Sequence, residues 1–167
     1  MILLRTLIFT LVVPGTVTVL VPRWLLSSSS APLLAGIGGF RYLGMLPILV
    51  GAAIYFWCAW NFTFAGRGTP APIDPPKKLV VQGLYRYVRN PMYLGVLCIL
   101  LGEAWLFQSG AILKYAAGGL ICAHLFVLLY EEPVLRGKFG EAYQRYCEAV
   151  PRWIPARRSR QTKSASA

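Results

Sequence analysis

Two apolar runs decide the fold of this chain: PMYLGVLCILLGEAWLF at residues 91–107 and ILKYAAGGLICAHLFVLLY at residues 112–130. A helix needs about 20 apolar residues to cross the hydrocarbon core of a bilayer, and both runs approach that length. The tight turn Gln108-Ser109-Gly110 leads from the first run into the second. The sequence therefore predicts an antiparallel hairpin of two membrane-spanning helices, Pro91–Phe107 and Ile112–Tyr130.

Two further apolar runs precede this hairpin, at Thr6–Val21, which Pro22–Trp24 closes, and at Tyr42–Phe64. Apolar residues make up 56% of the chain and charged residues 14%, whereas a soluble domain carries about 25% charged residues. We therefore predict an all-α integral membrane protein with four transmembrane helices. A signal peptide is the alternative for the first run, because Ser29–Ala31 resembles a cleavage site, although the following Pro32 argues against cleavage.

The net charge of +11 is distributed unevenly along the chain. Every Lys and Arg other than Arg5, Arg23 and Arg41 lies at or after Arg67, and all of these except Lys114 lie in two clusters that flank the hydrophobic runs. Cytoplasmic loops of membrane proteins carry such an excess of basic residues. We expect both termini and the loop at residues 65–90 to be cytoplasmic, in an inner or plasma membrane. Neither basic cluster contains a recognisable nucleic-acid-binding module, so no nucleic-acid partner is expected.

The four cysteines and the single histidine do not form a metal-binding pattern. Cys58, Cys98 and Cys122 lie in apolar runs, Cys147 lies in a polar segment, and no CxxC motif is present. Because a zinc site needs clustered Cys or His ligands, we expect no metal and interpret the cysteines as buried free thiols.

The chain changes character after Glu131. Pro133 suits the first turn of a new helix, and large apolar side chains then recur every three or four residues, which places them on one helical face. These residues are Leu135, Phe139, Tyr143, Tyr146 and Val150. We predict a C-terminal amphipathic helix that lies on the membrane surface or packs over the spans. The chain then divides into a two-span region at residues 1–64, a core at 65–155 and a basic, disordered tail at 156–167.

Three features are not explained by membrane insertion alone. GLYRYVRNPMYLG at residues 83–95 places Tyr and Arg side chains at the mouth of the third span. The pair Glu131-Glu132 ends the fourth span, and Glu103 lies within the third, where a carboxylate is costly. Their structural alternatives are an interfacial aromatic belt, a helix cap and an interfacial carboxylate.

The Tyr- and Arg-rich segment and the pair Glu131-Glu132 gather at the cytoplasmic ends of the hairpin and would suit a polar ligand that meets an apolar partner from the bilayer. Carboxylates accept hydrogen bonds from ribose hydroxyls, Lys and Arg bind a ligand carboxylate, and aromatic faces attract a sulfonium ion. S-adenosylmethionine carries all of these groups, so the pattern allows this cofactor without singling it out.

Three ordered motifs occur between residues 77 and 155. They are G-x-Y-x-x-x-R-N-P-x-Y-x-G from Gly83, E-E-x-x-L-x-x-x-F-G-x-x-Y-x-x-Y from Glu131, and V-P-R-W-x-P from Val150. With these motifs the chain resembles the isoprenylcysteine carboxyl methyltransferase family of integral membrane methyltransferases, and their wider relatives, the phospholipid methyltransferases.

The resemblance implies methyl transfer from S-adenosylmethionine to a lipophilic acceptor, such as an isoprenylcysteine carboxylate, another lipid or a small hydrophobic molecule. It also implies a cofactor cleft between the loop before the third span and the helix after the fourth, in which Glu131 binds the ribose or the amino group. The implied cofactor-binding residues are Lys77, Lys78, Leu79, Val80, Tyr85, Arg89, Asn90, Pro91, Met92, Tyr93, Glu131 and Glu132.

The sequence departs from the family pattern at two positions. Asn90 stands where many members have His, so contacts to a ligand carboxylate would fall to Lys77, Lys78 or Arg89. Val127 stands where eukaryotic members carry an arginine near the substrate, which argues against a prenylcysteine carboxylate as the acceptor.

The acceptor and the catalytic residues are not fixed by the sequence. A thiol or amine acceptor must lose a proton, for which His124 and Glu103 are the candidate bases. A lipophilic acceptor would arrive laterally from the bilayer, past His124 and Val127. Small residues expected to leave room beside the helices are Gly95, Gly102, Gly118 and Gly119. Two alternatives stay open: a membrane reductase that uses a nicotinamide cofactor, and a non-enzymatic membrane scaffold.

Overall fold

The described part of the chain, residues 2–28, 38–64 and 79–155 of a computed structural model, is a bundle of helices without a strand. The side chains of residues 2 and 3 are not described. The α-helices are α1 (Ile2–Gly15), α2 (Val21–Ser28), α3 (Met45–Phe64), α4 (Pro91–Leu106), α5 (Gly110–Phe126), α6 (Glu132–Phe139) and α7 (Glu141–Ala149). Helical turns of π type occupy Thr16–Leu20 and Val127–Glu131, and 3₁₀ turns occupy Gly38–Gly44 and Gly83–Arg86.

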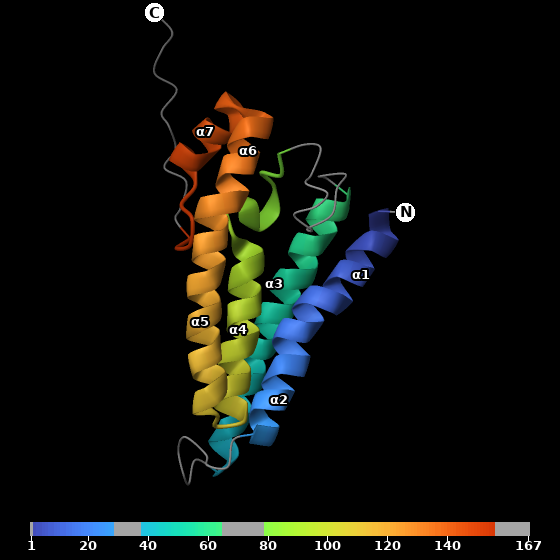
Figure 1. The fold of residues 1–167 in the computed structure, drawn as a ribbon, viewed down its shortest axis with the longest axis vertical. Helices are drawn as coiled ribbons and strands as arrows, with labels where there is room; N and C mark the ends of the chain where they lie inside the picture. Colours follow the sequence, from blue (N-terminus) through green and yellow to red (C-terminus); the bar gives the residue numbers. More distant parts are fainter. Residues whose placement is uncertain (1, 29–37, 65–78, 156–167) are drawn as a thin grey trace, which may run out of the picture.

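Among these residues, three continuous helices are long and apolar enough to cross a membrane: Leu4–Ser28, Gly38–Phe64 and Gly110–Phe139. The prediction of apolar spans is thus confirmed for three of them. The predicted third span, α4, is also apolar but has only 16 residues. Its length is about 24 Å, whereas the hydrocarbon core of a bilayer is about 30 Å thick. It lies alongside α3 and α5 and is followed by the predicted turn into α5 (Figure 1).

The 3₁₀ turn Gly38–Gly44 and α3 pack closely against α4 through four glycines, Gly44 and Gly51 on one side and Gly95 and Gly102 on the other. A Cβ atom on Gly44 would lie 2.5 Å from the carbonyl oxygen of Gly102, and one on Gly95 would lie 2.8 Å from that of Gly51. Small residues let helix backbones approach closely in membranes, where lipid supplies no hydrophobic drive for association. The expectation that Gly95 and Gly102 leave free space was therefore wrong, because the backbone of the facing helix fills it.

The first span is longer than predicted, because Pro22 does not end it. The helix passes through the π turn Thr16–Leu20 and continues as α2 to Ser28. A proline ring clashes with the preceding turn of a regular α-helix, and a wider π turn moves that carbonyl away. The hydroxyl of Thr18 donates to the carbonyl of Pro14 and satisfies one acceptor in this distorted stretch.

The C-terminal helix also differs from the prediction of one amphipathic helix after Glu131. The fourth span continues through the π turn Val127–Glu131 into α6, so Pro133 lies within a continuous helix two residues after a π turn, as Pro22 does. The break comes instead at Gly140, whose φ of 53° lies in the left-handed region that favours glycine. Helix α7 begins after it, and the predicted tail at 156–167 lies outside the described residues.

Replacing Gly51 with Ala should destabilise the protein by about 1–3 kcal/mol, because the new methyl group forces α3 away from the α4 backbone. Thermal unfolding in detergent measures the effect. Gly118→Ala is the matched control, since a Cβ on Gly118 meets no atom within 4 Å. Equal melting temperatures for the two variants would contradict the proposed packing.

Candidate functional site

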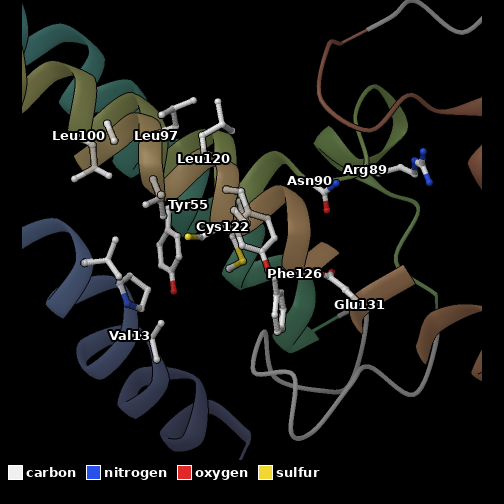
Figure 2. A pocket seen from close by; sticks show the side chains of 18 of the residues that line it. Val13, Tyr55, Arg89, Asn90, Leu97, Leu100, Leu120, Cys122, Phe126 and Glu131 are labelled. Carbon is white, nitrogen blue, oxygen red and sulfur yellow. Dashed lines mark hydrogen bonds between the residues drawn. The ribbon is translucent and has the colours of Figure 1, made fainter. Parts of the chain in front are cut away.

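A cavity of about 620 Å³ lies between α1, α3, α4 and α5. This volume falls within the range of about 300–1,000 Å³ that is typical of small-molecule sites. Most of the wall is apolar, and Arg89, Asn90 and Glu131 lie at one end, whereas Tyr55 lies in the apolar section (Figure 2). The apolar wall includes Phe9, Val13, Pro14, Val17, Leu97, Leu100, Leu120, Ala123 and Phe126.

The polar end of the cavity is formed where α4 begins and the fourth span ends. Asn90 precedes α4, and Pro91 occupies its first turn, where the missing N–H of proline costs no hydrogen bond. The hydroxyl of Tyr93, in the first turn of α4, donates to Oε2 of Glu131 at 3.1 Å. Asn90, Tyr93 and Glu131 all line the cavity, together with Tyr85. The predicted meeting of loop and helix is thus present in the fold.

Tyr85 and Tyr146 fasten the loop before α4. Tyr85 is buried, and the hydroxyl of Tyr146 donates to its backbone carbonyl at 2.9 Å. Burial raises the pKa of Tyr146, and it raises the pKa of Tyr85 well above its usual value, so both phenols stay neutral at physiological pH. The side chain of Tyr85 also packs with Cys58 and Val80 in a small apolar cluster. The 3₁₀ turn therefore presents its tyrosine to the cavity from a fixed position.

Glu132 points elsewhere, into a buried cluster of ion pairs. Its Oε1 accepts from Arg89 Nη1 at 3.0 Å and from Arg152 Nε at 2.7 Å, and its Oε2 accepts from Arg152 Nη2 at 3.1 Å. Arg89 Nη1 also donates to the sulfur of Cys147 at 2.8 Å. Glu132 is 5% exposed and is not part of the cavity wall. The Glu132 clamp, as we call Glu132 with Arg89 and Arg152, joins the loop, α6 and the C-terminal segment.

Backbone contacts extend the Glu132 clamp. The amide N–H of Arg89 donates to the carbonyl of Pro151 at 2.9 Å, and the side-chain nitrogen of Asn90 donates to the carbonyl of Arg152 at 3.2 Å. The hydrogen bond to Glu132 raises the pKa of the Arg152 guanidinium, which stays charged. Residues 150–155 are therefore fixed across the loop that carries Asn90.

The remaining residues of the predicted cofactor set have different surroundings. Met92 lines the cavity, Val80 and Pro91 are buried outside its wall, and Leu79 is half-buried. Arg89 contributes to the wall, but its guanidinium turns away from Asn90 and Glu131 toward the Glu132 clamp (Figure 2). The predicted Lys77 and Lys78 lie outside the described residues.

Neither candidate base lies on the cavity wall. His124 accepts a hydrogen bond at Nδ1 from the indole of Trp153 at 2.9 Å, with the two rings 6.0 Å apart. Glu103 lies near the opposite end of α4, where its Oε2 is buried and has no hydrogen-bond partner among the described residues. Val127 is 1% exposed and also lies off the wall, so the acceptor route predicted past His124 and Val127 does not coincide with the cavity.

Sequence reasoning missed one wall of the cavity and part of the Glu132 clamp. The wall formed by α1 gave no signal, because an apolar membrane helix does not reveal which face meets protein. Arg152 lies in the third motif, V-P-R-W-x-P. Its position in that motif was the sequence signal that could have indicated its pairing with Glu132. All four cysteines are free as predicted, but of the four only Cys58 is buried; Cys98 and Cys147 are half-buried, and Cys122 is exposed.

A protein-family comparison bears on what this cavity does. The family model described as phospholipid methyltransferase matches residues 40–142, which contain α3, α4, α5 and α6. The chain belongs to the phospholipid methyltransferase family. This membership confirms the resemblance drawn from the motifs and implies methyltransferase activity, and the long apolar helices indicate an integral membrane protein. Neither the curated proteins nor the solved structures gave a match.

Replacing Glu132 with Ala should destabilise the fold by about 3–5 kcal/mol, because it leaves two arginines uncompensated in a buried cluster. Urea or thermal unfolding of the purified protein measures the loss. Glu148→Ala removes an exposed carboxylate of α7 and is the control. A Glu132→Ala variant as stable as the Glu148→Ala variant would show that the clamp does not hold these segments.

Proposed function

We propose that this protein transfers a methyl group from S-adenosylmethionine to a lipophilic acceptor at the polar end of the cavity. The proposal rests on the composition of the cavity lining. The same cavity has Asn90, Tyr93 and Glu131 at one end and a long, mainly apolar section between transmembrane helices. A polar methyl donor suits the first part, and an apolar acceptor suits the second.

The residues at the polar end have the chemistry that the methyl donor requires. Glu131 is a carboxylate that Tyr93 already orients, and it would accept hydrogen bonds from the ribose hydroxyls or the amino group. The rings of Tyr85 and Tyr93 would face the sulfonium charge. When bound, S-adenosylmethionine supplies a methyl group activated by that charge. Lys77 and Lys78, which the sequence predicts for this role, would contact its carboxylate, whereas the guanidinium of Arg89 is held by Glu132.

The protein would accelerate the in-line displacement by positioning the two partners and excluding water. The Glu132 clamp fixes the loop and the C-terminal segment around Asn90, and the apolar wall holds the acceptor. An acceptor carboxylate would need no base. For a thiol or amine, Glu131 would be the candidate proton acceptor, because it lies on the described cavity wall and His124 and Glu103 do not.

The polar end would face the cytoplasm. The first residues of α1, the start of α4, and helices α6 and α7 lie at one end of the bundle (Figure 1). That end carries Arg86, Arg89, Arg136, Lys138, Arg145 and Arg152, and basic residues concentrate on the cytoplasmic side of membrane proteins. The protein would lie in an inner or plasma membrane. The water-soluble donor would then enter the cavity from the cytoplasm.

S-adenosylhomocysteine should bind the detergent-solubilised protein and raise its melting temperature, because a ligand that binds only the folded state stabilises it. Glu131→Gln should weaken this binding about ten- to hundred-fold, the loss expected for one charge-assisted hydrogen bond of about 1.5–3 kcal/mol. Calorimetry measures both affinities, with Glu148→Gln as the control. Unchanged affinity in a folded Glu131→Gln protein would contradict the assignment, and binding of a nicotinamide dinucleotide instead would favour the reductase alternative.

Cysteine labelling tests the orientation. In a background without Cys58, Cys98, Cys122 and Cys147, a membrane-impermeant thiol reagent added outside cells should label Ser29→Cys. It should leave Thr69→Cys and Ser164→Cys unlabelled until the membrane is opened, because the basic segments around them are expected on the inside. External labelling of Thr69→Cys would reverse the topology.

A further inference from the structure

The N-terminal helix walls one side of the cavity, although it lies outside the residues that match the family model. Phe9, Val13 and Val17 follow one another at intervals of four residues, so they share one face of the helix, and all three line the cavity. Val13 lies across the cavity from Leu97, Leu100 and Leu120 (Figure 2). Part of the binding space is thus built by a segment that the family core does not supply.

The attachment of α1 to the bundle differs from that of the core helices. Its described contacts with α3 include two pairs of hydroxyl groups, Thr6 with Thr63 at 3.2 Å and Thr10 with Tyr55 at 3.0 Å. Beyond the π turn, α2 packs against α5 at the other end of the bundle. Toward its N-terminal end α1 diverges from α4 and α5, as Figure 1 shows.

The opposite wall, on α5, has open space beside its glycines, unlike the tightly packed contact between α3 and α4. A Cβ on Gly118 or Gly119 would meet no atom within 4 Å, whereas each glycine of the α3–α4 contact abuts backbone. Cys122 and Phe126 continue the same wall one and two turns further toward Glu131. A band of apolar surface therefore runs from Gly118 to the polar end, with α1 facing it.

We propose that the apolar chain of the methyl acceptor lies between α1 and α5, against Val13 and Val17 on one side and Gly118–Cys122 on the other. The occupant is a flexible alkyl or prenyl chain, because the wall here is mostly apolar, the Tyr55 hydroxyl is already paired with that of Thr10, and the amide of Asn90 and the carboxyl group of Glu131 lie beyond it. Helix α1 is then the part of the protein that selects the acceptor, whereas the family core supplies the methyl-transfer site. The inference rests on the proposed function for the identity of the chain as an acceptor.

A photoreactive fatty alcohol, with a diazirine on its alkyl chain, probes this site without requiring turnover. Crosslinking to the purified protein in detergent, followed by peptide mass spectrometry, should label the segments around Val13–Val17 and Gly118–Cys122. Val13→Trp should reduce that labelling at least five-fold, because the indole fills the space of the chain. Val12→Trp, which enlarges an exposed neighbour outside the cavity wall, is the matched control and should label as the unchanged protein does.

The same two variants separate this inference from the proposed function. Val13→Trp should lower transfer to the lipid acceptor at least ten-fold while the affinity for S-adenosylhomocysteine changes less than two-fold. Labelling confined to other segments, or equal behaviour of Val13→Trp and Val12→Trp, would overturn the chain site. Failure of the unchanged protein to bind S-adenosylhomocysteine, with labelling at α1 and α5 intact, would overturn the proposed methyl transfer and leave the chain site standing.

Discussion

The Glu132 clamp is the interaction on which the polar end of the cavity depends. One buried carboxylate binds Arg89 from the loop before α4 and Arg152 from the C-terminal segment. Because Asn90 follows Arg89 directly and Glu131 precedes Glu132, the clamp fixes the spacing of the two polar groups that we assign to the methyl donor. A buried ion pair contributes little net stability, but losing one partner is costly. We therefore infer that the main effect of the Glu132 clamp is to position Asn90 and Glu131 relative to each other.

The two sides of α4 have different roles in the bundle: one packs against α3, and the other lines the cavity. Four glycines join α4 to α3 and the 3₁₀ turn before it on one side, and that contact leaves no space for a ligand. The other side of α4 faces α1 and α5 across the cavity, where the glycines of α5 have no close neighbour. Glycine therefore has two opposite uses in this membrane protein: close approach of backbones between α3 and α4, and open volume on α5.

The sequence predicted the apolar helices, the turn at Gln108-Ser109-Gly110 and the family, because these depend on local patterns and ordered motifs. It did not predict that the helix passes Pro22 and Pro133, because a proline in an apolar run usually marks a helix boundary, and here each proline follows a π turn by two residues. Adjacent carboxylates also look alike in sequence. Neighbouring helical residues point about 100° apart, so Glu131 faces the cavity while Glu132 meets Arg152, a partner 20 residues away.

The central claim is that one cavity brings a water-soluble methyl donor to a membrane-dissolved acceptor. In the most direct measurement, the purified protein is incubated with methyl-labelled S-adenosylmethionine and a total lipid extract of membranes. The products are then partitioned between an organic solvent and water. The account predicts protein-dependent label in the organic phase, suppressed by S-adenosylhomocysteine. Label that stays entirely in the aqueous phase, from a protein that binds S-adenosylhomocysteine, would contradict a lipophilic acceptor.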